Sequence, residues 1–412
     1  MAVGFLRWLG WLPRFGQWVH ALVSGISAGL RGAKAQDATT TPSYYRQLLE
    51  WPDQPDRPPL TKFEKATPGE ASAIRSVSRL AAGAVIGAYC EARKGDRSAK
   101  AMRDQHAKHH GCLQASFIVH DNLPADFAVG VFRPGRKYPA VVRFSNAMGS
   151  RQNDRKWDGR GMAVKLRDVN ARSLLSTLAS QHRPAEQDFL MTNHPVFFCK
   201  NADEYTSFMS IMAMPRGTRR ERVRFMWRFA RFFFPRRLRQ AWIFVATASR
   251  RPGSPLAVAY HSMTPYQLGD DRVVRYIATP TRRASGSPEN QEPLGDNFLH
   301  DALVSTLDPS TNPNGEPVVF DFSVHVRHAA TPADVENASR RWRRRRDRKV
   351  SLGRIEIPMQ RFGTAGDVSA CEDLSFNPWN CLPQHRPLGS LNRMRLAVYT
   401  ASMRVRHRLN AL

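Results

Sequence analysis

Short runs of β-branched and aromatic residues, separated by turns, recur along most of the chain. They cover residues 115–120, 127–133, 140–146, 161–167 and 187–193, with two further runs at 272–279 and 317–328. Closely spaced strands with few helices between them are typical of an antiparallel meander and not of a doubly wound sheet. The pattern therefore predicts an α+β fold whose sheet is an antiparallel barrel or sandwich.

Helical periodicity appears around these runs. Apolar residues at helical spacing predict helices over 71–93, 202–214 and 218–248, and again from Leu391 onward. A basic and aromatic segment, followed by a proline-rich stretch, precedes the first of them. We therefore expect a leader and linker over residues 1–61 and one folded domain over residues 62–412.

The leader allows more than one interpretation. It has no run of about 18 apolar residues, so it does not predict a membrane-spanning helix. Ala33-Lys34-Ala35 resembles a cleavage site for a signal peptide, but the apolar run before it is weak. An interfacial amphipathic segment and a peripheral helix that binds nothing remain the alternatives. We expect a cytoplasmic or peripheral membrane location, with a signal-peptide-like leader as the other option.

Charge and cysteine content add limits. The chain has 62 Lys and Arg against 35 Asp and Glu, a net charge of +27, which favours anionic partners. The five cysteines show no C-x-x-C pair and no zinc-like spacing, so we interpret them as mostly buried thiols without a disulfide framework.

Two basic segments are candidates for contact with such partners. Residues 219–233 interleave arginines with aromatics, which fits either an interfacial membrane helix or a helix packed on the barrel. Residues 340–349 form a basic block without a nucleic-acid motif, interpreted as a solvated or membrane-facing helix. We therefore expect peripheral membrane contact at most, and no specific nucleic acid.

One pair near the C-terminus has a chemical interpretation. Arg395 and Tyr399 lie four residues apart at helical spacing, so their side chains share one face. A tyrosine binds ferric haem as phenolate, and an adjacent fixed cation stabilises that anion. Taken alone, the pair is equally compatible with packing and solvation on a terminal helix.

Four segments in order give the pair its context: residues 103–124, 137–168, 187–205 and 376–389. They contain Arg-x-x-His, Val-Arg-Phe-Ser, Asp-Gly-Arg-Gly and Pro-Val-Phe-Phe, and together with the C-terminal helix they resemble the monofunctional catalase family over residues 95–410. The resemblance implies a catalase-like antiparallel β-barrel of about eight strands, with flanking helices and a helical C-terminus. It also implies haem b, a peroxide substrate and homo-oligomers. No flavodoxin-like C-terminal domain is expected.

The resemblance also implies roles for individual residues. His106 would be the distal acid/base, and Ser145 would orient its ring. Tyr399 would bind the iron. The other cofactor-contacting residues would be Arg103, Arg143 and Arg406 at the propionates, Phe197 on the porphyrin face and Arg395 beside the tyrosine.

One departure from the family pattern affects the expected reaction. Thr192 stands where the family has its distal asparagine, while the neighbouring Asn193 is kept. A hydroxyl offers one donor where an amide offers two, so disproportionation of hydrogen peroxide should be weak. We therefore expect a hydroperoxidase with a peroxidase-type outcome, acting on hydrogen peroxide or an organic or lipid hydroperoxide. The alternatives are a fatty-acid hydroperoxide isomerase or dehydratase on the same barrel, and a non-catalytic haem-binding protein.

Overall fold

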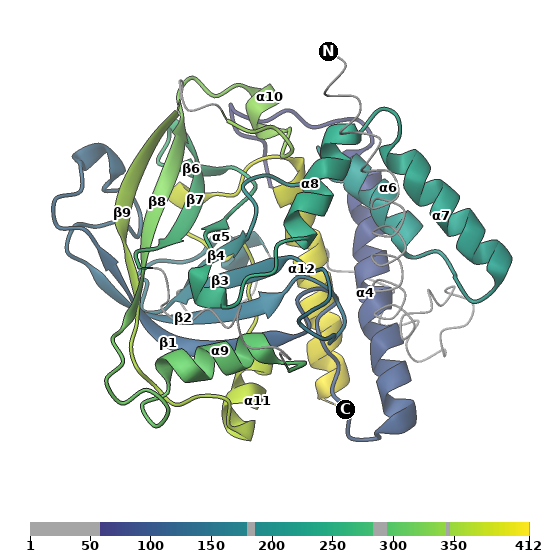
Figure 1. Cartoon of the computed structure of the whole chain (residues 1–412). Helices are drawn as coiled ribbons and strands as arrows, with labels where there is room; N and C mark the ends of the chain where they lie inside the picture. Colours follow the sequence, from purple (N-terminus) through teal and green to yellow (C-terminus); the bar gives the residue numbers. More distant parts are fainter. Residues whose placement is uncertain (1–57, 179–185, 283–294, 343–346, 412) are drawn as a thin grey trace, which may run out of the picture.

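The computed structural model describes residues 58–178, 186–282, 295–342 and 347–411. It places a β-barrel on one side and a layer of helices on the other (Figure 1). The strands are β1 (His109–Val119), β2 (Lys137–Asn146), β3 (Arg160–Leu166), β4 (Gln187–Thr192), β5 (Tyr260–His261), β6 (Tyr266–Leu268), β7 (Arg272–Pro280), β8 (Val318–Arg327) and β9 (Asp347–Ile357).

The strands form one closed antiparallel sheet. Their order is β5-β4-β3-β2-β1-β9-β8-β7-β6, and β5 also pairs with β7. The ring β1-β2-β3-β4-β5-β7-β8-β9 therefore closes as an eight-stranded barrel, while β6 pairs with another part of β7. The predicted α+β fold with an antiparallel barrel is confirmed.

Alternation along the strands assigns one set of side chains to the interior of the barrel and the next to its outer face. In β2, Val142 and Phe144 belong to the barrel core, and Arg143 and Ser145 therefore point outward. Aromatic rings fill much of the interior, including the T-shaped pair of Phe117 and Phe322 with ring centroids 5.0 Å apart. The functional polar residues of β2 thus lie outside a packed core.

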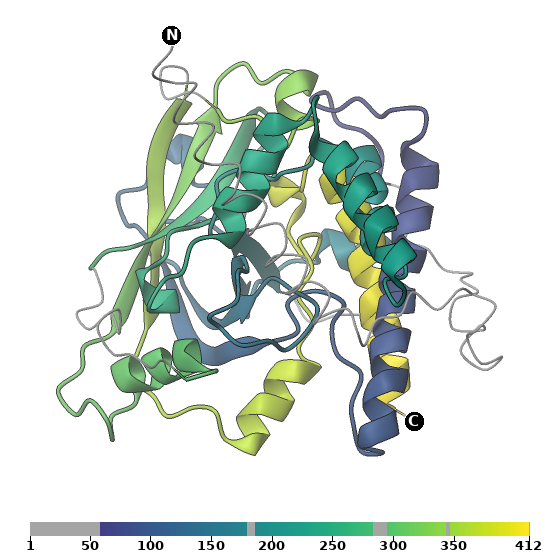
Figure 2. The same ribbon diagram turned by 45° about the vertical axis from the view of Figure 1, so that its right-hand side comes forward.

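The helices flank the barrel at one side and at one end. In both views α4 and α12 run side by side, while α9 and α11 lie near one end of the barrel (Figures 1 and 2). The helices are α4 (Glu70–Gly95), α5 (Leu174–Leu178), α6 (Ala202–Met212), α7 (Arg219–Phe233), α8 (Leu238–Ala248), α9 (Phe298–Leu307), α10 (Pro332–Val335), α11 (Ala365–Asp373) and α12 (Ser390–Asn410).

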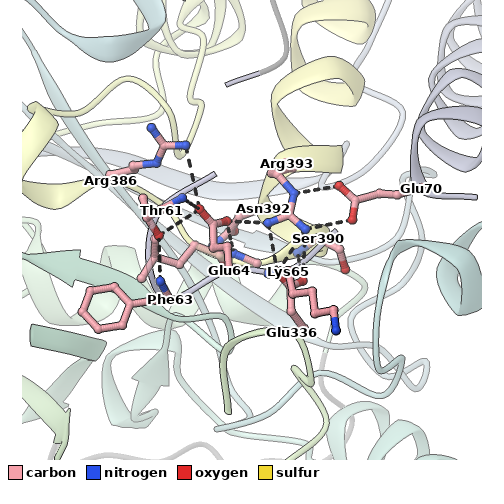
Figure 3. A network of polar contacts seen from close by, with 12 residues as sticks. Thr61, Phe63, Glu64, Lys65, Glu70, Glu336, Arg386, Ser390, Asn392 and Arg393 are labelled. Carbon is pink, nitrogen blue, oxygen red and sulfur yellow. Dashed lines mark hydrogen bonds and ion pairs between the residues drawn. The ribbon is translucent and has the colours of Figure 1, made fainter. Parts of the chain in front are cut away.

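A buried ionic network fixes the first turn of α12 (Figure 3). Arg393 has no exposed side-chain surface and binds Glu70 through Nε and Nη2, at 2.7 and 2.8 Å. The same guanidinium also donates to Glu64 and Glu336. Glu336 in turn accepts from the backbone N–H of Ser390 at 2.7 Å. The network therefore joins α12 to the chain before α4, to the start of α4 and to the segment after α10.

Several predicted elements are confirmed, since the runs at 140–146, 161–167, 187–193, 272–279 and 317–328 coincide with β2, β3, β4, β7 and β8. The run at 127–133 was wrong as a strand. Gly130 there has φ +61°, and a Cβ on it would lie 2.2 Å from the imidazole of His385. The predicted helix over 218–248 is broken at Pro235, which cannot continue α7.

Two further expectations need correction. The basic block at 340–349 is not one helix, because its last residues begin β9, between β1 and β8. The cysteines are not all thiols: Cys112 and Cys371 form a disulfide with a Cα–Cα distance of 5.9 Å, whereas Cys90, Cys199 and Cys381 form no disulfide. Sequence spacing could not show this pair, since 259 residues separate its members. Most of the predicted leader and linker (1–61), namely residues 1–57, lies outside the described residues.

We expect Arg393→Met to lower the free energy of unfolding by about 3–5 kcal/mol, because it leaves buried carboxylates without their partner. Urea denaturation followed by circular dichroism measures the loss. Arg408 is exposed on the same helix, so Arg408→Met is the matched control and should change stability by less than about 0.5 kcal/mol. Equal effects of the two substitutions would contradict the role of the network.

Candidate functional site

The candidate site lies where the chain passes between the outer face of the barrel and α12. His106 belongs to the segment just before β1 and has φ +57°, in the left-handed region that few non-glycine residues adopt. Its backbone N–H donates to the carbonyl of Ala147 at 3.1 Å. The neighbouring Asp104 accepts a hydrogen bond from Ser402 of α12 at 2.6 Å. The segment is therefore tied both to the barrel and to the helix.

The imidazole of His106 packs closely against β2 and β3. Its Nδ1 lies 2.9 Å from the hydroxyl of Ser145. A Cβ added to Gly161 would lie 2.6 Å from His106 Cε1, so only glycine leaves room for the ring at this point of β3. The structure therefore brings His106 and Ser145 together as the sequence interpretation expects, and it adds Gly161 as a residue that sequence reasoning treated only as part of a turn.

Burial and nearby cations keep His106 neutral. Burial lowers its pKa to about 3, and the guanidinium groups of Arg143 and Arg395 act in the same direction. Arg143 also donates from Nη2 to the backbone carbonyl of His106 at 2.8 Å. A neutral imidazole with one nitrogen at Ser145 keeps the other nitrogen available to exchange a proton.

Arg395 and Tyr399 lie one turn apart on α12, as their spacing predicts. Arg395 Nη2 lies 3.3 Å from the hydroxyl of Tyr399, and its guanidinium carbon lies 5.2 Å from the centroid of that ring. Nη1 contacts Asn392 at 3.2 Å and, at longer distances, Thr264 and Tyr266. These three polar groups hold the guanidinium in place, and no sequence motif pointed to any of them.

The two sides of the site retain accessible surface although they lie in the interior. On the barrel side, the outward-facing Ala163, Leu190 and Thr192 are only half-buried. On the other side Tyr399 and Phe197 are half-buried in one hydrophobic cluster. These partly exposed side chains lie on the two sides of the space between the outer face of the barrel and α12. One tyrosine and one histidine stand there, and these are donor types of a haem site.

Three arginines gather beside this space. Arg103 forms an ion pair with Glu372 of α11, and Arg406 donates to the carbonyls of Glu372 and Leu374. Burial lowers the pKa of Arg406 to about 10, and Arg103 contributes in the same direction. Burial likewise holds the pKa of Arg143 well below its ordinary range. The cluster therefore carries more positive charge than its direct carboxylate partner neutralises.

The residues present fit haem. The Nε of Arg143 is buried and has no hydrogen-bond partner among the described residues, so it can accept a further anionic ligand. The positive charge of Arg103, Arg143 and Arg406 matches carboxylate groups. Tyr399 could supply an oxygen ligand to the iron. A search of the described residues finds no group of three His, Cys, Asp or Glu side chains that could hold a bare metal ion.

The two residues at the end of β4 behave differently. Thr192 pairs with Gly161 and therefore faces the same side as His106, and its buried hydroxyl has no hydrogen-bond partner among the described residues. Asn193 instead uses its amide on the fold: Oδ1 accepts from the N–H of Arg160 at 3.1 Å, and Nδ2 donates to the carbonyl of Thr247 at 3.0 Å. The geometry does not support Asn193 as a catalytic residue, and it leaves Thr192 facing the site.

Sequence reasoning missed the part played by α11. Glu372 pairs with Arg103 and lies 3.4 Å from His109, and the disulfide from Cys371 to β1 holds this helix against the arginine cluster. Glu372 lies in a short acidic stretch that carries no recognisable motif. A cavity of about 400 Å³, lined by residues such as Arg133, Tyr138 and Asp168, lies away from the site, beside the chain between β1 and β2 and after β3.

We expect the protein to lose stability as the pH falls from 6.5 towards 4. Burial lowers the pKa of several histidines, and between their unfolded value of 6.5 and these lower values the unfolded state binds more protons, so acid favours unfolding. These are His106, His110 and His385, each with a pKa of about 3, and His109, His194 and His261, each with a pKa of about 4.

Urea midpoints measured from pH 7 to pH 4.5 test this expectation. Asp158, whose pKa burial raises to about 6, acts in the opposite direction, so the comparison uses a variant of the histidine with the simplest surroundings. Burial alone lowers the pKa of His385. The substitution His385→Gln should therefore reduce the slope of the free energy of unfolding against pH by about 1 kcal/mol per pH unit. An unchanged slope in this variant would contradict the assignment.

Comparison with known proteins gives the fold a precedent. The sequence matches no family model and no curated protein. The structure matches a fungal catalase with a TM-score of 0.57 at 15% identity, covering 76% of this chain and 61% of that one. Catalase A from Saccharomyces cerevisiae matches with a TM-score of 0.57 at 16% identity, covering 77% of this chain and 64% of that one. A bacterial catalase matches with a TM-score of 0.56 at 15% identity, covering 90% of this chain and 70% of that one. The chain therefore spans less than two thirds of the first two structures, and it has the fold of catalases.

Proposed function

We propose that this chain is a haem-dependent hydroperoxidase that cleaves hydrogen peroxide or an organic or lipid hydroperoxide with a peroxidase-type outcome. One observation carries the proposal: the His106–Ser145 pair on the barrel side and the Arg395–Tyr399 pair on α12 lie within electrostatic reach of each other. The likeness to catalases supports the proposal through the fold. The residues named above supply the chemistry.

Each part of the site has a place in this proposal. Tyr399 holds the iron of haem b, Arg103, Arg143 and Arg406 bind the propionates, and Phe197 packs on the ring. Haem, when bound, supplies the iron at which the O–O bond of a hydroperoxide is cleaved. Arg395 stays charged in this arrangement: burial lowers its pKa, but the phenols of Tyr399 and Tyr266 outweigh that effect and raise it.

His106 performs the proton transfer. Its depressed pKa of about 3 keeps the ring neutral at physiological pH, and Ser145 fixes the orientation of Nδ1. With Nδ1–H donated to Ser145, Nε2 carries a lone pair and takes the proton from the near oxygen of a hydroperoxide. The resulting imidazolium then returns that proton to the far, leaving oxygen. Gly161 allows the ring to stand against β3 in this position.

Thr192 selects the outcome of the reaction. Its hydroxyl has no hydrogen-bond partner in the described part of the chain, and it offers one donor where an amide would offer two. A second molecule of hydrogen peroxide is therefore held less well, which favours an organic donor as the reductant. The same feature favours the second candidate, a fatty-acid hydroperoxide isomerase or dehydratase, because rearrangement of one hydroperoxide needs no second molecule. A non-catalytic haem-binding protein is the third.

We expect the purified, haem-supplemented chain to show a high-spin tyrosinate-type haem spectrum that Tyr399→Phe abolishes. The substitution removes the only oxygen through which this side chain can bind iron, while the ring still packs among the same neighbours. Absorbance spectroscopy of both proteins at matched concentration checks the result. A mutant spectrum identical to that of the wild type would show that Tyr399 is not the ligand.

His106→Ala should keep the haem spectrum but lower turnover of hydroperoxide at least about 100-fold, the scale of a lost general acid/base. His328→Ala, at an exposed histidine in the turn after β8, is the matched control and should leave turnover near the wild-type value. Turnover of hydrogen peroxide and of a fatty-acid hydroperoxide is measured separately to identify the preferred substrate. Haem binding with turnover no faster than free haemin would favour the non-catalytic alternative.

Thr192→Asn should raise the disproportionation of hydrogen peroxide relative to peroxidase turnover, because it restores a second donor at the site. Oxygen release measured with an electrode, beside oxidation of an organic donor, gives the ratio. Thr192→Ser keeps one hydroxyl and is the control, for which we expect the wild-type ratio. A ratio that does not change with the amide would remove Thr192 from the account of specificity.

A further inference from the structure

Exposed apolar side chains are concentrated on the helical hairpin formed by α7 and α8, and we call this set the apolar ridge. Of the large hydrophobic side chains exposed in the described residues, all but Leu60 lie on this hairpin. They are Val223 (62% exposed), Trp227 (59%), Phe234 (38%), Leu238 (44%) and Trp242 (54%). Apolar side chains gathered in this way mark a surface that contacts an apolar partner.

The ridge is distinct from the buried face of the same helix. Phe225, Phe229 and Phe232 of α7 pack against α6 and α8, so this face is already occupied. Val223 and Trp227 lie one turn apart and about half a turn away from those phenylalanines, on the opposite face of α7. The expectation that this helix packs against the rest of the protein therefore holds for one face of α7. It does not explain the apolar side chains on the opposite face. Figures 1 and 2 show α7 on the outside of the helical layer.

The charge around the ridge identifies the kind of partner. Between residues 216 and 239 the only acidic residue is Glu221, whose side chain caps the start of α7. Eight arginines of this stretch are exposed, and within the described part of the chain none of them forms an ion pair. They are Arg219, Arg220, Arg222, Arg224, Arg228, Arg231, Arg236 and Arg239. A purely cationic rim around exposed tryptophans suits lipid phosphates above acyl chains.

Tryptophan and arginine are also combined directly. The guanidinium carbon of Arg231 lies 5.2 Å from the centroid of the Trp227 ring, one turn along α7. Such a pair presents an apolar ring with a cation over its face, a combination suited to the boundary between headgroups and acyl chains. No helix of the described residues is long and apolar enough to cross a membrane. An attachment through this hairpin would therefore be peripheral.

We propose that the α7–α8 hairpin docks the protein on an anionic lipid surface, with Trp227 and Trp242 entering the interface and the flanking arginines binding headgroup phosphates. The proposal does not depend on haem, because it rests on exposed side chains outside the candidate site. A membrane is the partner we propose, because a protein that binds these exposed arginines would have to supply many carboxylates at once.

The inner side of the hairpin connects the docked surface to the candidate site. Thr247 of α8 accepts from the amide of Asn193, and Arg250 donates to the Asn193 carbonyl at 2.9 Å. Asn193 directly follows Thr192, which faces the site. Where the proposed function also holds, this arrangement makes a lipid hydroperoxide the preferred substrate class, since such a molecule would enter beside α8.

Vesicle co-sedimentation of the full-length chain tests the proposal, with phosphatidylcholine vesicles alone or mixed with phosphatidylglycerol. We expect binding to the anionic vesicles only. The variant Trp227→Ser with Trp242→Ser should weaken it at least about tenfold, and so should the triple change of Arg220, Arg224 and Arg228 to Glu. The conservative pair Trp227→Phe with Trp242→Phe should retain binding.

A charge-matched control separates a docking surface from general attraction. Arg133, Arg136 and Arg167 are exposed and lie on segments around β2 and β3, so changing these three to Glu alters the net charge equally. The control triple should bind like the wild type. An equal loss of vesicle binding in the two triple Arg→Glu variants would overturn the proposal. Full vesicle binding by the variant Trp227→Ser with Trp242→Ser would also overturn it. So would a hairpin that instead mediates self-association, seen as a dimer in sedimentation velocity that the Trp→Ser pair abolishes.

Turnover provides a second readout. If the hairpin docks on lipid, the variant Trp227→Ser with Trp242→Ser should no longer turn over lipid hydroperoxide held in anionic vesicles. The same variant should still turn over hydrogen peroxide in solution. Absence of any turnover with intact vesicle binding would count against the proposed function and not against docking. Loss of vesicle binding with normal turnover of vesicle-held substrate would count against docking.

Discussion

The position of α12 depends on one buried cation. Arg393 lies in the first turn of this helix and binds three carboxylates from separate parts of the chain, so it fixes both the axial position and the rotation of α12 (Figure 3). Arg395 and Tyr399 follow on the same helix, and a rotation of one residue would turn both away from His106. Burying charges is unfavourable unless each is paired, which the bidentate contact with Glu70 achieves. The network therefore contributes more to the specific position and rotation of α12 than to the net free energy of unfolding.

The opposite wall of the site follows from strand alternation. Every second residue of β2 and β3 enters the aromatic core of the barrel, and the residues between them must face outward. Because Phe144 is part of that core, Arg143 and Ser145 cannot be. Gly161 and Ala163 are small, and β3 therefore leaves space on its outer face where larger side chains would have filled it. The histidine and the arginine cluster occupy the edges of that space.

Much of this could be predicted from the sequence, because the signals were local. The spacing of Arg395 and Tyr399, the alternation in β2 and the ordered motifs each specify a short piece of structure. What could not be predicted depends on contacts between distant residues. Glu372 enters the site through α11, and Cys112 meets Cys371 across 259 residues. The run at 127–133 had strand composition, but Gly130 bends it to make room for His385, a residue far along the chain.

The high arginine content serves two physical situations that burial distinguishes. Arg143 is buried, its pKa is held well below the ordinary range, and its Nε has no hydrogen-bond partner among the described residues, so a bound anion is favourable at that point. The arginines of α7 are solvated, so each gains little from one anion, and a surface of many phosphates is needed for strong attraction. A discrete dianionic ligand therefore suits the interior cluster, while an extended anionic surface suits the hairpin. The net charge of +27 cannot distinguish these uses, but the burial of individual side chains does.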